Sequence, residues 1–301
     1  MSRSLSLLPS ANALVVFEAA ARLGSFKRAA EELNVTQPSI SQTVRAMEDR
    51  LGGALFVRGN RGVQLTAAGA ELMSAVEPAL RRIDGALRSI SATGNRTISI
   101  ASSTSVATQW LLPLTASFQR AHPDLNVRLL ATDRNVEPGG DVDFTIRRGP
   151  VDWDLPNCWH VSDEVLYTIC SRSYLARRGP VSDIRDLANH DIIHNHEAFR
   201  NRMNWREWLS AQGFGELQLP ETLTLNEYQL VIQACIAGEG IALGWSITTK
   251  ALVDQGILVR PLDNEVHTGH AFYILGDPET RLSRHKMDYV DWIRSGLTAS
   301  A

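Results

Sequence analysis

Short apolar stripes follow one another near the start of the chain, and each ends at residues that favour a turn. The segment ALVVFEAAARLG, which begins at Ala13, has apolar residues close to helical spacing and stops at Gly24, a residue favoured just after a helix. Ser25 is a favourable N-cap for the next stripe, FKRAAEELN, and Asn34 begins a short turn. The pattern therefore predicts two helices, the second of which ends at a tight turn.

A third helix is predicted for the segment QPSISQTVRAMEDRLG, which follows Thr36. Thr36 is a favourable N-cap, and Pro38 lies in the first turn, where its missing N–H does no harm. The apolar residues at positions 40, 44, 47 and 51 share one face of this helix. Two short helices joined by so tight a turn are typical of a helix-turn-helix, with this segment as the recognition helix.

The opposite face of the third helix is polar, and a basic hairpin follows it. After Gly52-Gly53 the stretch ALFVRGNRGVQLT predicts two short strands around a turn, which form a β-hairpin wing. Polar side chains on the helix can bind base edges or phosphates in a major groove, and basic residues on a wing suit phosphate or minor-groove contacts. A polar face alone is more often an ordinary solvated surface, and the wing is what favours DNA binding. The candidate DNA-binding residues are Ser25, Thr36, Gln37, Pro38, Ser39, Ser41, Gln42, Arg45, Arg58, Asn60 and Arg61.

A long amphipathic helix is predicted from Thr66, its N-cap, to about residue 91. Over about 25 residues it would be about 38 Å long, enough to hold two DNA-binding heads on successive major grooves. Its apolar residues recur at alternating spacings of three and four, as in a helix that pairs with a second helix. The alternative is that the helix packs on its own domain, and Pro78 is a place where it can bend. The candidate dimerisation residues are Met73, Val76, Leu80, Ile83, Leu87 and Ile90.

Strand-like and helix-like patterns alternate beyond the polar segment RSISATGNRT at residues 88–97, which predicts a hinge between domains. The predicted strands are TISIA, NVRLLAT, DFTIRRG, EVLYTICS, DIIHNH, TLTL and IALGWS. The predicted helices are VATQWLLPLTASFQRAH, MNWREWLSAQGF and EYQLVIQACIAG. This alternation predicts an α/β fold with mainly parallel sheets.

The N-terminal part resembles a LysR-type transcriptional regulator. The likeness is carried by FEAAARLGSFKRAAEELNVTQPSISQTVRAMEDRLGGALFVRGNRGVQLTAAG, from Phe17 to Gly69. The segments WLLPLTASFQRAHPDLNV, DFTIRRG, CSRSYL and AGEGIALG resemble the branch of this family that contains the glycine-cleavage activator and the β-lactamase regulator. The resemblance implies a winged helix-turn-helix, antiparallel pairing through the linker helix and usually a homotetramer. The wing sequence GNRGVQ departs from the family pattern, so base preference at the wing does not carry over.

The resemblance also implies that the C-terminal part is an effector domain like a periplasmic binding protein, with two subdomains and a cleft. The predicted organisation is a DNA-binding domain at residues 1–65, a dimerising linker helix at 66–91 and an effector domain at 92–301. Within the effector domain, subdomain I is expected at about 96–161 and 267–301, and subdomain II at about 162–266. The expected function is sequence-specific transcriptional regulation in which a small-molecule effector, a small carboxylate, modulates promoter binding. The expected partners are promoter DNA, the effector, further copies of the chain in a homodimer or homotetramer, and RNA polymerase if the protein is an activator.

Ligands of α/β sheets bind beyond the carboxyl ends of strands, so the residues found there are candidate effector contacts. Hydroxyls and amides at residues 102–104, where a helix is expected to start, favour a carboxylate or simply cap the helix. Arg147 and Arg148 end another strand, where a guanidinium pairs with a ligand carboxylate or with an acid between the subdomains. The candidate effector-binding residues are Ser102, Ser103, Thr104, Arg147, His194, Asn226, Tyr228, Trp245 and Ser246.

Composition and charge are consistent with this division. The chain has 301 residues, of which 44% are hydrophobic, more than a single core usually organises, so two or three compact units are expected. Residues 1–92 carry 11 Lys and Arg against 8 Asp and Glu, a net charge of +3, whereas the remainder carries 19 against 25, a net charge of −6. A basic head on an acidic body suits DNA binding by the head. No apolar run approaches the roughly 18 residues that span a bilayer, and no signal-peptide pattern opens the chain, so we expect a cytoplasmic protein with no membrane partner.

Several patterns that suggest other chemistry are weak. Cys158, Cys170 and Cys235 are far apart and lack zinc or disulfide-framework spacing, so they are expected to be reduced, mostly buried thiols. The sequence HNH at 194–196 lacks partnering acids or cysteines at metal-ligand spacing. GEGIALG has its glycines before a strand rather than between strand and helix, and GWSIT lacks the second glycine of a nucleophile elbow. We therefore expect no enzyme, no catalytic residue, no metal and no cofactor.

Two other functions are consistent with parts of the chain. The C-terminal domain alone would serve as a cytoplasmic solute-binding module, although the attached DNA-binding head argues against that. An architectural DNA-binding protein would bend DNA without an effector. A promoter-binding protein that gives no thermal shift with any small molecule would favour this last function.

Overall fold

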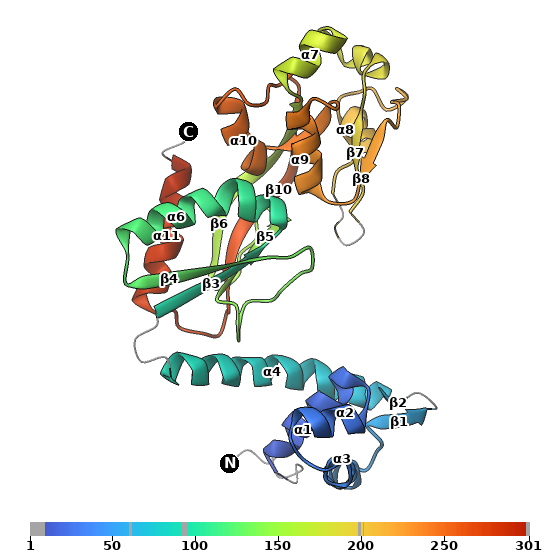
Figure 1. Ribbon diagram of the computed structural model, residues 1–301, viewed down its shortest axis with the longest axis vertical. Coiled ribbons are helices and arrows are strands. Elements are labelled where there is room, and N and C mark those ends of the chain that lie inside the picture. Colours follow the sequence, from blue (N-terminus) through green and yellow to red (C-terminus); the bar gives the residue numbers. More distant parts are fainter. Residues whose placement is uncertain (1–9, 60–61, 92–95, 198–199, 201, 299–301) are drawn as a thin grey trace. The chain divides into compact units, whose positions relative to one another are not determined.

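The computed structural model describes residues 10–59, 62–91, 96–197, 200 and 202–298 (Figure 1). The described chain divides into two compact units. The N-terminal unit contains nearly all residues up to 93, and the C-terminal unit nearly all residues from 94 onward.

The N-terminal unit consists of helices and one small hairpin. Its elements are α1 (Asn12–Leu23), α2 (Phe26–Glu32), α3 (Gln37–Leu51), β1 (Phe56–Gly59), β2 (Gly62–Leu65) and α4 (Ala67–Ser91). Helices α2 and α3 form the predicted helix-turn-helix, and β1 and β2 form the wing. Helix α4 is the predicted long helix and continues through Pro78. One apolar core, which includes Phe17, Ile40, Val44 and Phe56, joins the helices to the wing.

Capping residues set the limits of these helices as the sequence predicts. The hydroxyls of Ser25, Thr36 and Thr66 each accept a hydrogen bond from the backbone N–H three residues further on. Such caps satisfy N–H groups that the first turn of a helix leaves free. Gly24 ends α1 with a φ of 61°, a left-handed conformation that glycine adopts without a steric penalty. These predicted helix boundaries are confirmed.

Backbone contacts fix the wing to the helices. The N–H of Val63 donates to the carbonyl oxygen of Gly24 over 3.0 Å. A Cβ at Gly62 would lie 2.3 Å from that same oxygen, so a larger residue would push the wing away. The carboxylate of Glu48 in α3 accepts hydrogen bonds from the two N–H groups at residues 55–56, just before and at the start of β1. The wing is therefore held in a defined position relative to the recognition helix.

The C-terminal unit is built around a sheet whose strand order in the described chain is β4-β3-β5-β10-β6-β9. The strands are β3 (Arg96–Ser102), β4 (Leu125–Ala131), β5 (Phe144–Pro150), β6 (Cys158–Ile169), β9 (Ala242–Trp245) and β10 (Glu265–Gly276). A smaller parallel sheet pairs β7 (Ile193–Asn195) with β8 (Leu223–Leu225). The helices are α5 (Thr104–Val106), the π-helical turn η2 (Ala107–Leu111), α6 (Leu112–Ala121), α7 (Arg172–Arg178), the 3-10 helix η3 (Ile184–Asn189), α8 (Trp205–Ala211), α9 (Tyr228–Ala237), α10 (Ser246–Asp254) and α11 (Arg284–Thr298).

Figure 1 shows the elements of this unit in two lobes that β6 and β10 connect. Strands β3, β4 and β5 lie in one lobe with α6 and α11, and we call this lobe subdomain I. Strands β7, β8 and β9 lie in the other with α7 to α10, and we call it subdomain II. β6 and β10 pair with each other as they pass between the lobes. The two-subdomain architecture is the one that the sequence predicts, whereas the exact boundaries stay a prediction.

The strand directions differ from the predicted mainly parallel sheet. β3 is parallel to both β4 and β5, but the pairs β5-β10, β10-β6 and β6-β9 are antiparallel. The parallel prediction is therefore right for subdomain I up to β5 and for β7-β8, and wrong for the rest. The reason is that β6 and β10 are long connecting strands that pair with each other, which an alternation of strands and helices does not reveal. The pattern also left β10, α7, α10 and α11 unassigned.

Candidate functional site

The face of α3 that was predicted to contact DNA is exposed. Thr36, Gln37, Pro38, Ser39, Gln42 and Arg45 are exposed, and Ser25 and Ser41 are half-buried. Among the residues that the structure describes, the side chains of Gln37, Gln42 and Arg45 have no hydrogen-bond or ion-pair partner. On the opposite face Ile40, Val44 and Met47 are buried in the core, whereas Leu51, at the C-terminal end of the helix, is 40% exposed. Free donors and acceptors on a fixed helix are what base-edge contacts in a major groove require.

The wing supplies the second set of predicted DNA contacts. β1 and β2 are antiparallel, and their register pairs Phe56 with Leu65 and Gly59 with Gly62. Asn60, Arg61 and the side chain of Arg58 lie outside the described residues. Their contacts with DNA therefore stay a prediction.

The apolar stripe of α4 divides into two parts with different surroundings. Met73, Val76 and Leu80 pack against the core of their own unit, which is the alternative that the sequence left open for the whole helix. Ile83 and Leu87 are 56% and 60% exposed, and the side chain of Ile90 lies outside the described residues. Dimerisation through these residues stays a prediction. Ile83 and Leu87 are the ones left exposed for it, whereas the first three are wholly or partly covered within one chain.

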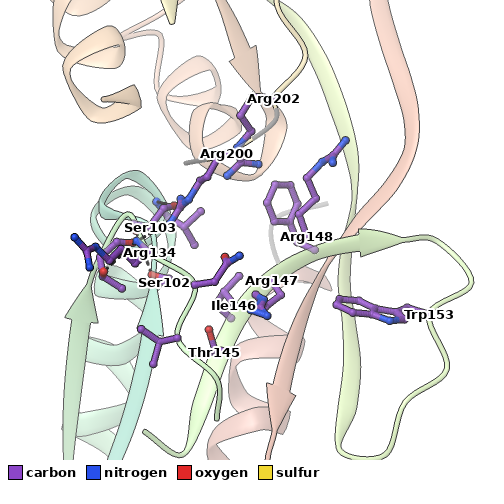
Figure 2. A pocket seen from close by; sticks show the side chains of 15 residues that line it. Ser102, Ser103, Arg134, Thr145, Ile146, Arg147, Arg148, Trp153, Arg200 and Arg202 are labelled. Carbon is purple, nitrogen blue, oxygen red and sulfur yellow. Dashed lines mark hydrogen bonds between the residues drawn. The ribbon is translucent and has the colours of Figure 1, made fainter. Parts of the chain in front are cut away.

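A cavity of about 370 Å³ lies in the C-terminal unit, and residues from both subdomains line it. Its described lining consists of Ser102, Ser103, Val106, Thr132, Arg134, Asn135, Val136, Thr145, Ile146, Arg147, Arg148, Trp153, Arg200, Arg202 and Phe272. Figure 2 shows Ser102, Ser103 and Arg147 on the side of subdomain I and Arg200 and Arg202 on the side of subdomain II. Five of the described lining residues are arginines, and none is an acid, so the surface offered to a ligand is strongly cationic.

Of the predicted effector contacts, Ser102, Ser103 and Arg147 line this cavity. The hydroxyl of Ser103 also caps α5 by accepting a hydrogen bond from the N–H of Val106, and the hydroxyl of Ser102 donates to the carbonyl oxygen of Ser103. Arg147 forms an ion pair of 2.6 Å with Glu137, whose side chain is 74% exposed. These groups face the cavity and are held in place by local contacts.

The other predicted effector contacts do not line the cavity, namely Thr104, His194, Asn226, Tyr228, Trp245 and Ser246. Tyr228 is buried, and its hydroxyl donates to the carbonyl oxygen of Leu243 and accepts from the N–H of Trp245. His194 donates through Nε2 to the carbonyl oxygen of Pro220. These contacts stabilise subdomain II itself. Effector binding by the six residues stays a prediction that their surroundings do not favour.

Two arginines of the cavity contact a buried carboxylate, that of Glu164 on β6. Its side chain is 1% exposed and accepts hydrogen bonds from Arg148 Nε at 2.7 Å, Trp245 Nε1 at 2.9 Å and Thr268 Oγ1 at 2.5 Å. Arg202 approaches the same carboxylate at 3.6 Å. Glu164 therefore joins both subdomains and the two connecting strands, and it compensates part of the positive charge at the cavity.

Two further arginines complete the cationic lining on the side of subdomain II. Arg200 donates to the carbonyl oxygens of Thr132 and Asp133 in subdomain I, at 2.8 and 3.1 Å. Arg202 is 17% exposed and lies over the ring of Trp245. Burial lowers the pKa of the Arg202 guanidinium. The carboxylates of Glu197 and Glu164 oppose this shift, and the positive charges of Arg200 and Arg148 add to it.

Sequence reasoning missed most of these charged residues. It noted Arg148 but not Arg134, Glu164, Arg200 or Arg202. The signal for the last two was present, because the segment FRNR at residues 199–202 follows the predicted strand DIIHNH and precedes a predicted helix. For Glu164 no local signal existed, since its partners lie 16 to 104 positions away along the chain.

The remaining reactive groups lie apart from the cavity. Burial raises the pKa of the Cys170 thiol to about 12 and also raises the pKa values of Cys158 and Cys235. Thiols in such surroundings are poor nucleophiles. Within the described ranges, no group of three or more His, Cys, Asp or Glu is arranged to hold a metal ion. No helix in the described part of the chain is long and apolar enough to cross a membrane.

Comparison with known proteins identifies both units. Residues 11–70 match the family model described as the bacterial regulatory helix-turn-helix protein, lysR family, and residues 91–298 match the LysR substrate binding domain. The glycine cleavage system transcriptional activator of Escherichia coli K12 is 34% identical over 89% of this chain and 87% of its own length. The transcriptional activator AmpR of Citrobacter koseri is 31% identical over 86% of this chain and 89% of its own length. These relatives match the branch that the sequence resembles.

Solved structures share the fold. The full-length structure of the Vibrio cholerae virulence activator AphB aligns with 94% of this chain and over 98% of its own length. The TM-score is 0.53 and the sequence identity is 17%. The effector domain of AmpR from Pseudomonas aeruginosa covers 69% of this chain and 98% of its own, with a TM-score of 0.54 and 20% identity. The chain belongs to the LysR family of DNA-binding transcriptional regulators, which are not enzymes and which join a helix-turn-helix to an effector-binding domain.

Proposed function

We propose that this regulator binds its promoter through α3 and the wing and that a small carboxylate in the arginine-lined cavity modulates the binding. The protein acts in the cytoplasm as a homodimer or homotetramer, and it contacts RNA polymerase if it is an activator. The observation that carries the effector part is the lining of one cavity by arginines from both subdomains, with no acid among the described lining residues. Guanidinium groups bind carboxylates through paired hydrogen bonds.

The DNA-binding part rests on the exposed polar face of α3. Gln42 and Arg45 lie one turn apart on that face, and the helix that carries them is fixed by a buried apolar side. Their side chains reach base edges, whereas the basic wing adds phosphate contacts that carry little sequence information.

The effector acts by its different affinity for two arrangements of the regulator. A ligand that contacts Arg147 from one subdomain and Arg200 from the other favours a particular separation of the subdomains. Because a ligand shifts an equilibrium only through such a difference, operator DNA changes the affinity for the effector by the same factor as the effector changes the affinity for DNA.

Substitution of the cavity tests the effector part. In Arg147→Gln, a panel of acetate, glycine, benzoate and succinate should lose its effect on operator affinity, while basal operator binding remains. Arg206→Gln is the matched control, because Arg206 is an exposed arginine of α8 outside the lining. Gel-shift titrations with and without each carboxylate measure the basal operator affinity and the change that the carboxylate causes. A normal response in Arg147→Gln would remove the cavity from the effector site, and no response in the wild-type protein to any small molecule would favour an architectural role.

Charge on the exposed half of α4 tests the assembly. Ile83→Glu together with Leu87→Glu would place unpaired charges in the proposed interface at a cost of several kcal/mol, so the assembly should dissociate. Val35→Glu is the control, since Val35 is an exposed apolar residue outside α4. Sedimentation velocity measures the oligomeric state. An unchanged oligomeric state in the double variant would show that Ile83 and Leu87 do not form the interface between subunits.

A further inference from the structure

The arginines that line the cavity carry more positive charge than a single carboxylate would balance. Arg134, Arg147, Arg148, Arg200 and Arg202 all face it. The carboxylates that pair with Arg147, Arg148 and Arg202 lie outside the lining, and one of them, on Glu137, is largely in water. Arg147, Arg148 and Arg200 already donate hydrogen bonds to Glu137, Glu164 and two backbone carbonyl oxygens, so the positive charge, rather than the number of donors, distinguishes the possible ligands.

The arginines closest to subdomain II are the least compensated. Arg148 and Arg202 share the one carboxylate of Glu164. Glu197 reaches Arg202 only at 3.9 Å, and its Oε2 has no hydrogen-bond partner among the described residues. No described carboxylate lies within 4.0 Å of Arg200, whose guanidinium donates to two backbone carbonyl oxygens instead. Positive charges gathered in a partly buried place repel one another, and an anion of more than one charge would relieve the repulsion.

The rest of the lining suits an organic ligand of modest size. Val106, Val136, Ile146, Trp153 and Phe272 provide apolar surface beside the arginines. A volume of about 370 Å³ lies at the small end of the range for ligand cavities, which begins at about 300 Å³. The cavity thus combines a cationic part with an apolar wall.

We propose that the ligand of this cavity is a small organic anion of charge −2 or more, with one anionic group held by Arg148, Arg200 and Arg202. The proposal rests on the proposed function and narrows it. Arg148, Arg200 and Arg202 face the carboxylates of Glu164 and Glu197 and keep an excess of one positive charge. Arg147, whose partner Glu137 is largely in water, adds a second, so a monocarboxylate would leave part of the cavity charge unbalanced. A dicarboxylate and a phosphate monoester have this chemistry in common. In either, the second charge or the organic part extends toward Arg147 and the hydroxyls of Ser102 and Ser103.

Pairs of probes that differ by one charge test the proposal by calorimetry on the full-length protein. Succinate is compared with succinamate, and methyl phosphate with dimethyl phosphate, at about pH 8, well above the second pKa of a phosphate monoester near 6. We expect at least one dianion to bind about tenfold or more tightly than its monoanionic partner, the effect of one additional charge-assisted contact. Preference within the succinate pair identifies a dicarboxylate, and preference within the phosphate pair identifies a phosphate monoester.

Variants tie the preference to the arginines. In Arg200→Gln the dianion preference should fall to about a third or less, because one uncompensated charge is removed. Arg206→Gln, an exposed residue of α8 outside the lining, is the matched control and should keep the full preference. Arg202→Lys retains the positive charge beside Glu164 but loses the planar guanidinium group that can donate to two oxygens at once. Thermal unfolding checks that each variant is folded.

The outcomes separate this inference from the proposed function. Equal binding of monoanions and dianions would overturn the inference and leave a carboxylate effector in place. Failure of all four probes to bind at millimolar concentration would also overturn it, while operator binding would still be measured independently. A dianion preference that Arg200→Gln leaves unchanged would place the second charge elsewhere and overturn the assignment to these arginines.

Discussion

The recognition face of α3 and the arginine-lined cavity are both polar surfaces, but their side chains are held in opposite ways. On α3, Gln42 and Arg45 come from one helix, are exposed and have no partners among the described residues. At the cavity, Arg148 and Arg202 meet on the buried carboxylate of Glu164. The helix supplies a rigid backbone with free side chains, whereas the cavity supplies side chains that are already fixed.

This difference has a physical origin in burial. A charged group that stays in water needs no partner, so α3 can present free side chains to DNA at no cost in stability. A charge inside the protein must be compensated before any ligand arrives, so the cavity needs Glu164 even when it is empty. Substitutions on α3 should therefore change binding alone, and substitutions around Glu164 should change both binding and stability.

The largest expected effect is that of Glu164→Gln. The change leaves the guanidinium groups of Arg148 and Arg202 without their shared negative charge, which should lower the free energy of unfolding by about 3 kcal/mol. The temperature of thermal unfolding should fall by roughly 6 to 12 °C, as expected for a unit of this size. In the same variant, binding of succinate or methyl phosphate should become tighter, because the competing carboxylate is gone.

Operator affinity of the Glu164→Gln variant provides the internal control. It should equal that of the wild type when no anion is present, since α3 belongs to the other unit. If the variant unfolds at the wild-type temperature, Glu164 does not compensate the cavity charges, and the cavity does not differ from α3 in needing a fixed partner for its arginines.

Arg45→Ala is expected to have the next largest effect. Loss of one base-edge contact should weaken operator binding by about 1 to 3 kcal/mol, or roughly fivefold to 150-fold, and relax the preference for the operator over random DNA. The unfolding temperature should stay unchanged because the side chain is exposed and has no partner in the described structure. Gel-shift titration and thermal unfolding on the same preparations measure the two quantities. A loss of stability in Arg45→Ala would show that the Arg45 side chain has a partner within the protein.

Arg50→Ala gives a matched comparison on the same helix. Arg50 is also an exposed arginine of α3, but it lies near the C-terminal end, away from the residues predicted to meet bases. Equal losses of operator preference in Arg45→Ala and Arg50→Ala would point to a general effect of charge rather than to base recognition.

The smallest effect is expected at the wing. Arg58→Ala and Arg61→Ala should each lower affinity for operator and random DNA to a similar degree, by about threefold to tenfold at low salt. The slope of log affinity against log salt concentration should decrease by about one for each variant, because one phosphate contact is lost. A change in operator preference in either variant would mean that the wing reads bases as well.

Local patterns in the sequence were sufficient to predict the N-terminal unit in detail. The hydroxyls of Ser25, Thr36 and Thr66 cap the helices that they were expected to cap, and the wing follows α3 as predicted. Capping and helical periodicity depend on residues within a few positions of one another, so the sequence alone contains them. The polar face of α3 could be identified for the same reason.

The apolar stripe of α4 was visible in the sequence, but its surroundings were not. Periodicity placed Val76, Leu80, Ile83 and Leu87 on one face of the helix. Which of them pack within the chain depends on where the helix lies against its own unit, and the structure buries only the first part of the stripe. A period specifies a face but not what covers it.

The tertiary structure alone decided the composition of the cavity. Ser102 and Arg202 are 100 positions apart in the sequence, and β6 and β10, which bring the subdomains together, include a strand that the pattern did not predict. The sequence determined that strand ends would carry polar and cationic residues. Which of these meet, and that a buried Glu164 balances two of them, follows from long-range strand pairing, because charges separated along the chain interact only once folding has placed them together in a medium of low dielectric constant.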